Sequence, residues 1–128
     1  MSHRSRLAGF IIDCQHGDLG ASSAFWGAAL GMSVADPDAG GTGRYAEFDD
    51  TPGGLHIEVQ TVEHPSRVHL DIEADDVEAE VKRLEALGAT RVAFVKTRWW
   101  VMEAPTGHRF CVVPMQDEPG RSAPHRWD

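Results

Sequence analysis

The sequence predicts an α+β fold in which a strand, a helix and three further strands follow one another twice. The prediction rests on segments with strand or helix periodicity, separated by turns rich in glycine and proline. The two expected helices begin at Asp18 and Asp75, about 57 positions apart, and each ends just before a glycine, Gly31 or Gly88. This equal spacing indicates an internal duplication.

The first module is expected over about residues 7–62. An apolar run rich in β-branched residues predicts its first strand at 7–14. Asp18 can accept amide hydrogens at the start of a helix over 21–30. Three strands follow, at 32–34, 44–48 and 55–61, and the last alternates strictly between apolar and polar residues. Its polar face carries His56, Glu58 and Gln60.

The first helix has an apolar side, which is expected to face the core. This side consists of small residues and one aromatic ring, Ala24, Phe25, Ala28 and Ala29. Trp26 is expected in the core or at an interface.

The second module is expected over about residues 67–115. Its first strand, 68–73, alternates Val68, Leu70 and Ile72 with His69, Asp71 and Glu73. Asp75 and Glu78 have the spacing of a capping box at the start of the second helix. The remaining strands are expected at 90–95, 98–102 and 110–113.

The composition is that of one globular domain, expected over residues 1–116 with a tail over 117–128 whose end frays. The 128 residues are 41% hydrophobic and 25% charged, which excludes a disordered chain, a collagen and a coiled coil. A net charge of −8 disfavours nucleic acid as a partner, and the apolar runs are too short to span a membrane. Because no apolar segment follows the N-terminal arginines, a signal peptide is not expected, and the predicted location is cytoplasmic with Cys14 and Cys111 reduced.

Several short motifs carry a family resemblance: Ile12-Asp13-Cys14, Phe25-Trp26-Gly27-Ala28-Ala29-Leu30-Gly31-Met32, Arg67-Val68-His69-Leu70-Asp71-Ile72, Leu87-Gly88-Ala89, and Ala104-Pro105-Thr106-Gly107-His108-Arg109-Phe110-Cys111-Val112-Val113. In order and spacing they resemble the vicinal oxygen chelate superfamily, which includes glyoxalase I, bleomycin-resistance proteins and extradiol dioxygenases. Small bacterial glyoxalase-like domain proteins are the most similar. The resemblance covers roughly residues 7–115.

The resemblance implies that the two modules form a cup-shaped mixed sheet with the helices outside. Metal-dependent members place four ligands on the first and last strands of each module. Carried over to this chain, these positions give Glu58, His69 and Cys111 as metal ligands. The fourth position falls at residues 9–11, whose side chains cannot bind a metal ion, and a thiol replaces the usual glutamate at Cys111.

This departure leaves two functions open, and whether the protein is an enzyme stays undecided. The first is a binding protein that holds a small planar or anionic molecule in a cup without metal, in a resistance or sequestration role. The second is a lyase or isomerase of the glyoxalase type that uses one divalent ion, zinc, nickel, manganese or iron, held by Glu58 and His69. Glu58, Asp71 and His56 are its candidates for proton transfer.

Further residues are candidates for contact with a small molecule. Neighbouring Trp99 and Trp100 point to opposite faces of a strand, and Trp100 is expected to stack on a planar ligand in the cup. Arg98 is a candidate partner for an anion, and Asp13 and His56 for hydrogen bonds to the ligand. A solvent-exposed side chain or a purely structural one is the alternative for each. A homodimer is expected, because small members of the family usually pair.

Overall fold

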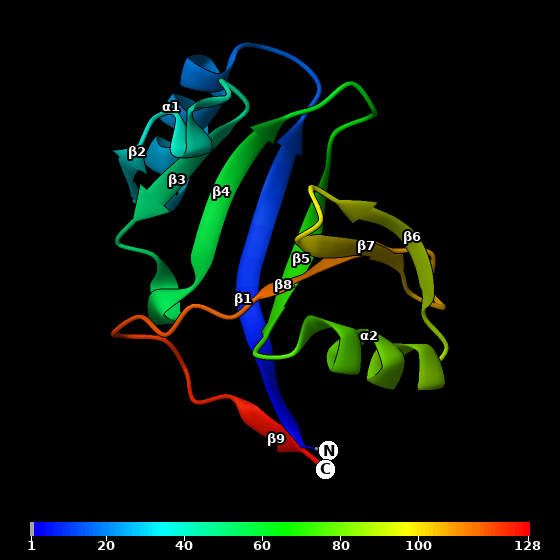
Figure 1. Ribbon diagram of the computed structural model, residues 1–128. Helices are drawn as coiled ribbons and strands as arrows, with labels where there is room; N and C mark the ends of the chain where they lie inside the picture. Colours follow the sequence, from blue (N-terminus) through cyan, green and yellow to red (C-terminus); the bar gives the residue numbers. More distant parts are fainter. Residues whose placement is uncertain (1) are drawn as a thin grey trace. The chain divides into compact units, whose positions relative to one another are not determined.

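The computed structural model describes residues 2–128, which divide into two compact units. We call residues Gly9–Val68 the first unit, and residues 2–8 together with His69–Asp128 the second unit. Each unit contains a strand, a helix and three more strands in that order, so the predicted duplication of a βαβββ module is confirmed (Figure 1). None of the helices within residues 2–128 has the length and apolar character needed to cross a membrane.

The first unit is a four-stranded sheet with one helix. Its elements are the end of β1 (His3–Cys14), α1 (Leu19–Leu30), β2 (Ser33–Asp36), β3 (Tyr45–Asp49) and β4 (His56–Thr61). The strand order is β2-β3-β4-β1. β1 and β4 run parallel, and the other neighbours run antiparallel. Two short 3-10 turns, η1 (Ala39–Gly41) and η2 (Pro52–Gly54), precede β3 and β4.

The expected orientation of α1 is wrong. Its buried side consists of Ser23 and Gly27, whereas the predicted apolar side is exposed, with Phe25 62% exposed. The reason is close packing, because a Cβ atom at Gly27 would lie 2.8 Å from the carbonyl oxygen of Met32. Only a residue without a side chain allows this approach, so the side with Ser23 and Gly27 faces the sheet and the Phe25 ring is exposed. The predicted caps of α1, Asp18 and Gly31, are confirmed.

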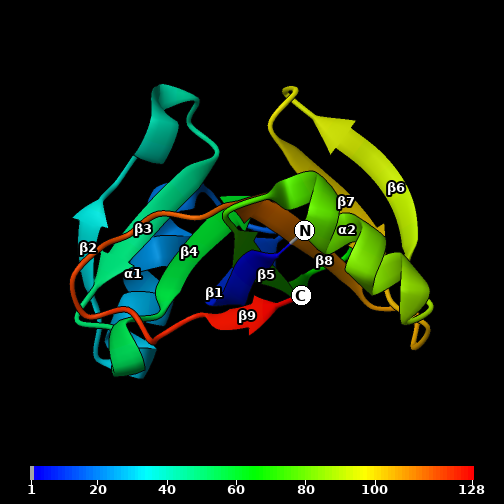
Figure 2. The ribbon, with the colours of Figure 1, turned by 60° about the horizontal axis from the view of Figure 1, so that its bottom comes forward.

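The second unit repeats this plan. Its elements are β5 (Arg67–Ala74), α2 (Val77–Ala86), β6 (Thr90–Val95), β7 (Trp99–Glu103), β8 (Arg109–Pro114) and β9 (His125–Trp127). The strand order is β5-β8-β7-β6, with β5 and β8 parallel. α2 lies against one face of this sheet (Figure 2), where Val81 and Leu84 pack on Met102 and Val112.

The start of α2 differs from the prediction by one residue. Asp76, not Asp75, is the N-cap, and its carboxylate accepts the Ala79 amide hydrogen at 3.0 Å. Asp75 instead accepts hydrogen bonds from the backbone and side chain of Arg4, at 2.7 and 3.0 Å. The backbone hydrogen bond from Arg4 is the main reason that the pKa of Asp75 is lowered. A partner 71 positions away in the sequence therefore decides which aspartate caps the helix.

The expected fraying of the C-terminal end is wrong for residues 125–127. They form β9, which pairs antiparallel with His3–Ser5 at the start of β1. The Trp127 indole donates a hydrogen bond to Ser5 Oγ at 2.8 Å. The guanidinium carbon of Arg83 lies 3.8 Å from the centre of the Trp127 ring, which adds a cation–π contact. These contacts anchor the end of the chain on the second unit.

Candidate functional site

Three side chains that can bind a metal ion meet on one face of the second unit's sheet. His69 and Asp71 alternate along β5, and Cys111 on β8 is in register with Asp71. Residues two positions apart on one strand, and residues in register on neighbouring strands, point to the same side of a sheet. One nitrogen, oxygen or sulfur atom from each of the three lies within 4.8 Å of the other two. The pair His69 Nε2 and Asp71 Oδ1 is 3.6 Å apart.

This cluster lies on the face opposite α2. Asp71 and Cys111 are buried and His69 is half-buried, so the ligand atoms are partly shielded from water. The apolar residues of β5 differ in burial. Ile72 packs on the α2 core, whereas Val68 and Leu70 are exposed. The predicted alternation of this strand is correct, and the α2 core covers only Ile72 and Ala74 of its apolar face.

Glu58 lies in the first unit, on β4. His56 Nε2 and Glu58 Oε1 are 2.7 Å apart, and His56 Nδ1 is 3.7 Å from Glu47 Oε1. On β1, the residue in register with Glu58 is the buried Ile11, so this strand supplies no ligating side chain at that position, as the sequence predicts. A carboxylate, an imidazole and a second carboxylate therefore stand side by side in the first unit.

The structure adds one candidate ligand that the sequence analysis missed. From the sequence, Asp71 is a candidate for proton transfer or for orienting His69, whereas the structure groups it with His69 and Cys111 as a possible metal ligand. The usable signal was its position two residues from His69 on an alternating strand, which places both on one face.

Trp99 and Trp100 point to opposite faces of the sheet, as predicted. However, Trp100, which was expected to face the ligand, lies on the side that α2 covers. Trp100 lies on the α2 side, where its ring centre is 5.0 Å from that of Phe94 and 4.9 Å from the Arg91 guanidinium carbon. Val101 is in register with Cys111, so the alternate residue Trp99 shares the face of Cys111. The placement of Trp100 beside the polar cluster is therefore wrong, and Trp99 is the better candidate for contact with a ligand there.

The remaining two predicted contact residues occupy different surroundings. Arg98 is exposed in the turn between β6 and β7. Asp13 is almost completely buried in the first unit, and its Oδ2 lies 3.9 Å from Arg67 Nε and 4.0 Å from His64 Nε2. Asp13 therefore acts first as the partner of two basic side chains.

Comparison with known proteins identifies the family. The model of the glyoxalase-like domain family matches residues 9–113. The chain belongs to the glyoxalase-like domain family. None of the curated proteins matches this glyoxalase-like domain.

Solved structures show the same fold at low sequence identity. A hypothetical protein from Bacillus halodurans C-125 has a TM-score of 0.64 and 11% identity, covering 89% of this chain and 96% of its own. Methylmalonyl-CoA epimerase from Mycobacterium tuberculosis has a TM-score of 0.61 and 16% identity, covering 86% and 90%. A glyoxalase/bleomycin resistance protein/dioxygenase superfamily member from Vibrio splendidus 12B01 has a TM-score of 0.55 and 17% identity, covering 87% and 99%. The glyoxalase-like domain thus has the fold of the vicinal oxygen chelate superfamily.

The imidazole, carboxylate and thiol of the polar cluster are groups that could hold a divalent metal ion. Imidazole, carboxylate and thiolate are all zinc ligands, and bonds of about 2.0–2.3 Å in a tetrahedron place ligand atoms about 3.3–3.8 Å apart. The 3.6 Å between His69 Nε2 and Asp71 Oδ1 agrees with such an edge. The thiol of Cys111 favours zinc over magnesium or manganese, which prefer oxygen ligands.

Proposed function

We propose that the protein binds one zinc ion through His69, Asp71 and Cys111 and uses it to bind a small oxygen-bearing molecule. The observation that carries this proposal is the meeting of an imidazole, a carboxylate and a thiol within 4.8 Å on one sheet face. Three protein ligands and one open position are typical of zinc sites that take part in chemistry. A lyase or isomerase reaction of the glyoxalase type is the matching class of activity.

The residues of the second unit would each have a distinct part in this function. A bound zinc ion would act as a Lewis acid that polarises oxygen atoms of the substrate. Burial of Asp71 and Cys111 limits competition from water for their ligand atoms. Trp99, on the same face as Cys111, offers an indole ring on which a planar molecule can stack.

A second candidate function is binding or sequestration of a small molecule without metal and without chemistry. The observation that favours it is Ile11, which stands in register with Glu58 where a metal-dependent member would need a ligand. In that case Glu58 and His56 act as hydrogen-bonding groups for the molecule. This function predicts a compound that raises the melting temperature of protein free of metal.

Metal content distinguishes the two functions. Protein purified without chelator and loaded with zinc is expected to hold about one ion per chain, measured by elemental analysis. His69→Ala is expected to reduce this to about a tenth or less. In cobalt-loaded protein, Cys111→Ser is expected to remove the charge-transfer absorption of a thiolate bound to cobalt.

A matched control is His56→Ala, which removes a half-buried imidazole from the first unit. It is expected to leave the zinc content unchanged. If wild-type protein holds no ion under any loading, zinc binding is refuted and the metal-free function is supported. If Glu58→Gln empties the site as completely as His69→Ala does, the assignment of the three ligands is incomplete.

A further inference from the structure

The sheet face that carries the polar cluster continues into an apolar strip. Val101 on β7 is in register with Cys111, and Ala93 on β6 is in register with Val101. Two positions away on the same two strands, Trp99 and Val95 form another pair. Because residues in register and alternate residues share a face, these four side chains lie beside the cluster, on the side of the sheet away from α2. We call Ala93, Val95, Trp99 and Val101 the apolar strip.

The apolar strip is open to a bound molecule. Val95, Trp99 and Val101 are half-buried, and Ala93 is exposed. Covering apolar surface is favourable, and binding sites for small molecules combine such surface with a few polar groups. The carbon skeleton of a molecule held at the polar cluster therefore gains free energy when it lies along the strip.

Other parts of this face carry ion pairs instead. Glu73 is the next residue of the face on β5 and is 3% exposed. Its carboxylate accepts hydrogen bonds from Arg6 Nε and from the Gln116 amide. Glu103 shares the face at the far end of β7, where it accepts a hydrogen bond from Arg109 Nε at 3.3 Å. The direction from the cluster towards β6 is thus the apolar one.

A lysine stands at the end of the apolar strip. The ammonium nitrogen of Lys96 lies 5.8 Å from the centre of the Trp99 ring, which is a cation–π distance. Lys96 and Thr97 both have left-handed backbone, with φ of 51° and 50°, and the Arg98 amide donates to the Val95 carbonyl oxygen at 3.0 Å. This conformation is unfavourable for residues other than glycine, above all for a β-branched threonine. Strained turns of this kind persist where the surrounding structure fixes them, and they are frequent at binding sites.

The same turn is basic in a chain that is acidic. Residues 86–102 contain Arg91, Lys96 and Arg98 but no Asp or Glu, whereas the whole chain has a net charge of −8. Arg91 is compensated by two glutamates of α2. For Lys96 and Arg98, in contrast, the part of the chain that the structure describes, residues 2–128, supplies no carboxylate partner. Two uncompensated cations at the end of an apolar surface are complementary to an anionic group.

From these features we infer that the proposed zinc site takes an elongated molecule with an acidic group at its far end. The inference rests on the proposed function and names the class of molecule for it. Oxygen atoms at one end bind the metal, a flat or apolar middle lies on the apolar strip, and the acidic group pairs with Lys96. Val101 and Trp99 are two residues apart on one strand, about 7 Å, so the acidic group stands on the order of 10 Å from the metal-binding oxygen atoms.

The test compares two aromatic hydroxamates, which bind metal ions through two oxygen atoms. Benzohydroxamate has no charge at its far end, whereas 4-carboxybenzohydroxamate has a carboxylate there. Each is titrated into the full chain loaded with cobalt, and the visible spectrum of the cobalt ion gives the dissociation constant. At low ionic strength the carboxylate compound is expected to bind about fivefold tighter, as an exposed ion pair allows. This preference is expected to fall as added salt screens the charges.

Two variants separate the charge from the apolar contacts. Lys96→Gln is expected to reduce the preference for the carboxylate compound to less than about twofold. Trp99→Ala is expected to weaken both hydroxamates about tenfold with the cobalt content unchanged. The matched control is Lys82→Gln, which removes another exposed lysine of the second unit. It is expected to keep the preference of the wild type.

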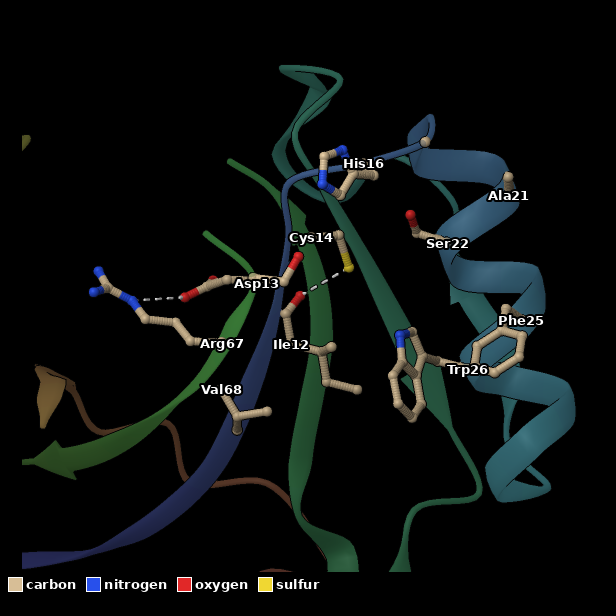
Figure 3. A pocket seen from close by; sticks show the side chains of 12 residues that line it. Ile12, Asp13, Cys14, His16, Ala21, Ser22, Phe25, Trp26, Arg67 and Val68 are labelled. Carbon is tan, nitrogen blue, oxygen red and sulfur yellow. Dashed lines mark hydrogen bonds and ion pairs between the residues drawn. The ribbon is translucent and has the colours of Figure 1, made fainter. Parts of the chain in front are cut away.

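A second control removes an aromatic ring from the first unit. A hollow of about 490 Å³ lies there beside α1, and Phe25 and Trp26 line it (Figure 3). Arg67 points to Asp13 and away from these two rings, so the hollow does not combine apolar surface with a cation as the strip does. Phe25→Ala is expected to change the affinity of neither hydroxamate.

The outcomes distinguish this inference from the proposed function. If the chain binds cobalt and benzohydroxamate changes its spectrum, but the two hydroxamates bind equally well, the inference is wrong and the proposed metal site stands. A preference that persists undiminished in Lys96→Gln also overturns the inference. If the chain takes up neither cobalt nor zinc, the proposed function and the inference are refuted together.

Discussion

Gly9→Ala is expected to lower the free energy of unfolding by about 3 kcal/mol or more. Gly9 is in β1 and in register with His56 on the parallel neighbour β4. A Cβ atom at this position would overlap the backbone carbonyl oxygen, carbon and nitrogen of His56. Because the obstacle is main chain in a hydrogen-bonded sheet, it cannot rotate away as a flexible side chain would. The strands must separate, and His56 and Glu58 move with β4.

Urea unfolding followed by circular dichroism measures this effect. A matched control is Gly20→Ala in α1, where the nearest atom to a new Cβ is Asp18 Oδ1 at 3.4 Å. Alanine is the better helix former, so this variant is expected to match the wild type or gain up to about 1 kcal/mol. Equal midpoints for Gly9→Ala and wild type would contradict the close approach of β1 to β4.

Glu80→Ala is expected to destabilise the protein by about 3–5 kcal/mol. The Glu80 side chain is 0% exposed. Its Oε1 is 2.8 Å from His3 Nε2 and accepts a hydrogen bond from Arg83 Nε at 2.7 Å, and its Oε2 accepts one from Arg83 Nη2 at 2.9 Å. Removing this carboxylate leaves His3 buried without its acceptor and a cavity beneath α2. It also releases Arg83, which holds the indole of Trp127.

Thermal and urea unfolding check this expectation, with Glu85→Ala as the control. Glu85 belongs to the same helix and pairs with Arg91 at 2.9 Å, but it is exposed. Exposed ion pairs contribute about 0–1 kcal/mol, so the control is expected to stay within that range. A Glu80→Ala variant as stable as the Glu85→Ala variant would contradict a structural role for the buried carboxylate.

The Glu80 network also predicts acid sensitivity. Burial opposes ionisation of Glu80, but hydrogen bonds from Arg83, His3 and Ser5 outweigh it, so its pKa is lower than the usual 4.5. A carboxyl group with a lowered pKa stabilises the folded state above its unfolded pKa and loses this contribution as the pH falls through its folded pKa. The difference in stability between wild type and Glu80→Gln is therefore expected to be constant near neutral pH and to shrink below about pH 4.5, as measured by urea unfolding at several pH values.

The order of elements could be predicted from the sequence because local signals decide it. Asp18 and Gly31 are the two ends of α1 as expected, and the polar face of β5 carries His69 and Asp71. Alternation along one strand needs no knowledge of distant residues, which is why this part of the site was predictable.

Other features depend on partners far away in the sequence. Gly27 determines which side of α1 faces the sheet, because its lack of a side chain lets the helix approach the backbone of Met32. Its hydrophobicity gives no sign of this role. Asp75 loses the cap position to Asp76 through its bonds to Arg4. The reversed tryptophans have the same cause, since Trp99 and Trp100 are equally apolar and the position of α2 decides which one is covered. Hydrophobic patterning cannot resolve choices between two apolar faces.

Strand β1 affects the order in which the two units can fold during synthesis. Its residues from Gly9 onward complete the first unit, whereas residues before Gly9 belong to the second. When the ribosome has released residue 68, every residue of the first unit is available, and that unit can fold during synthesis. The opening residues His3–Ser5 must wait until β9, some 120 positions later, has emerged. Residues His3–Ser5 are thus expected to be among the last segments to gain protection from hydrogen exchange, although they are synthesised before the rest of both units.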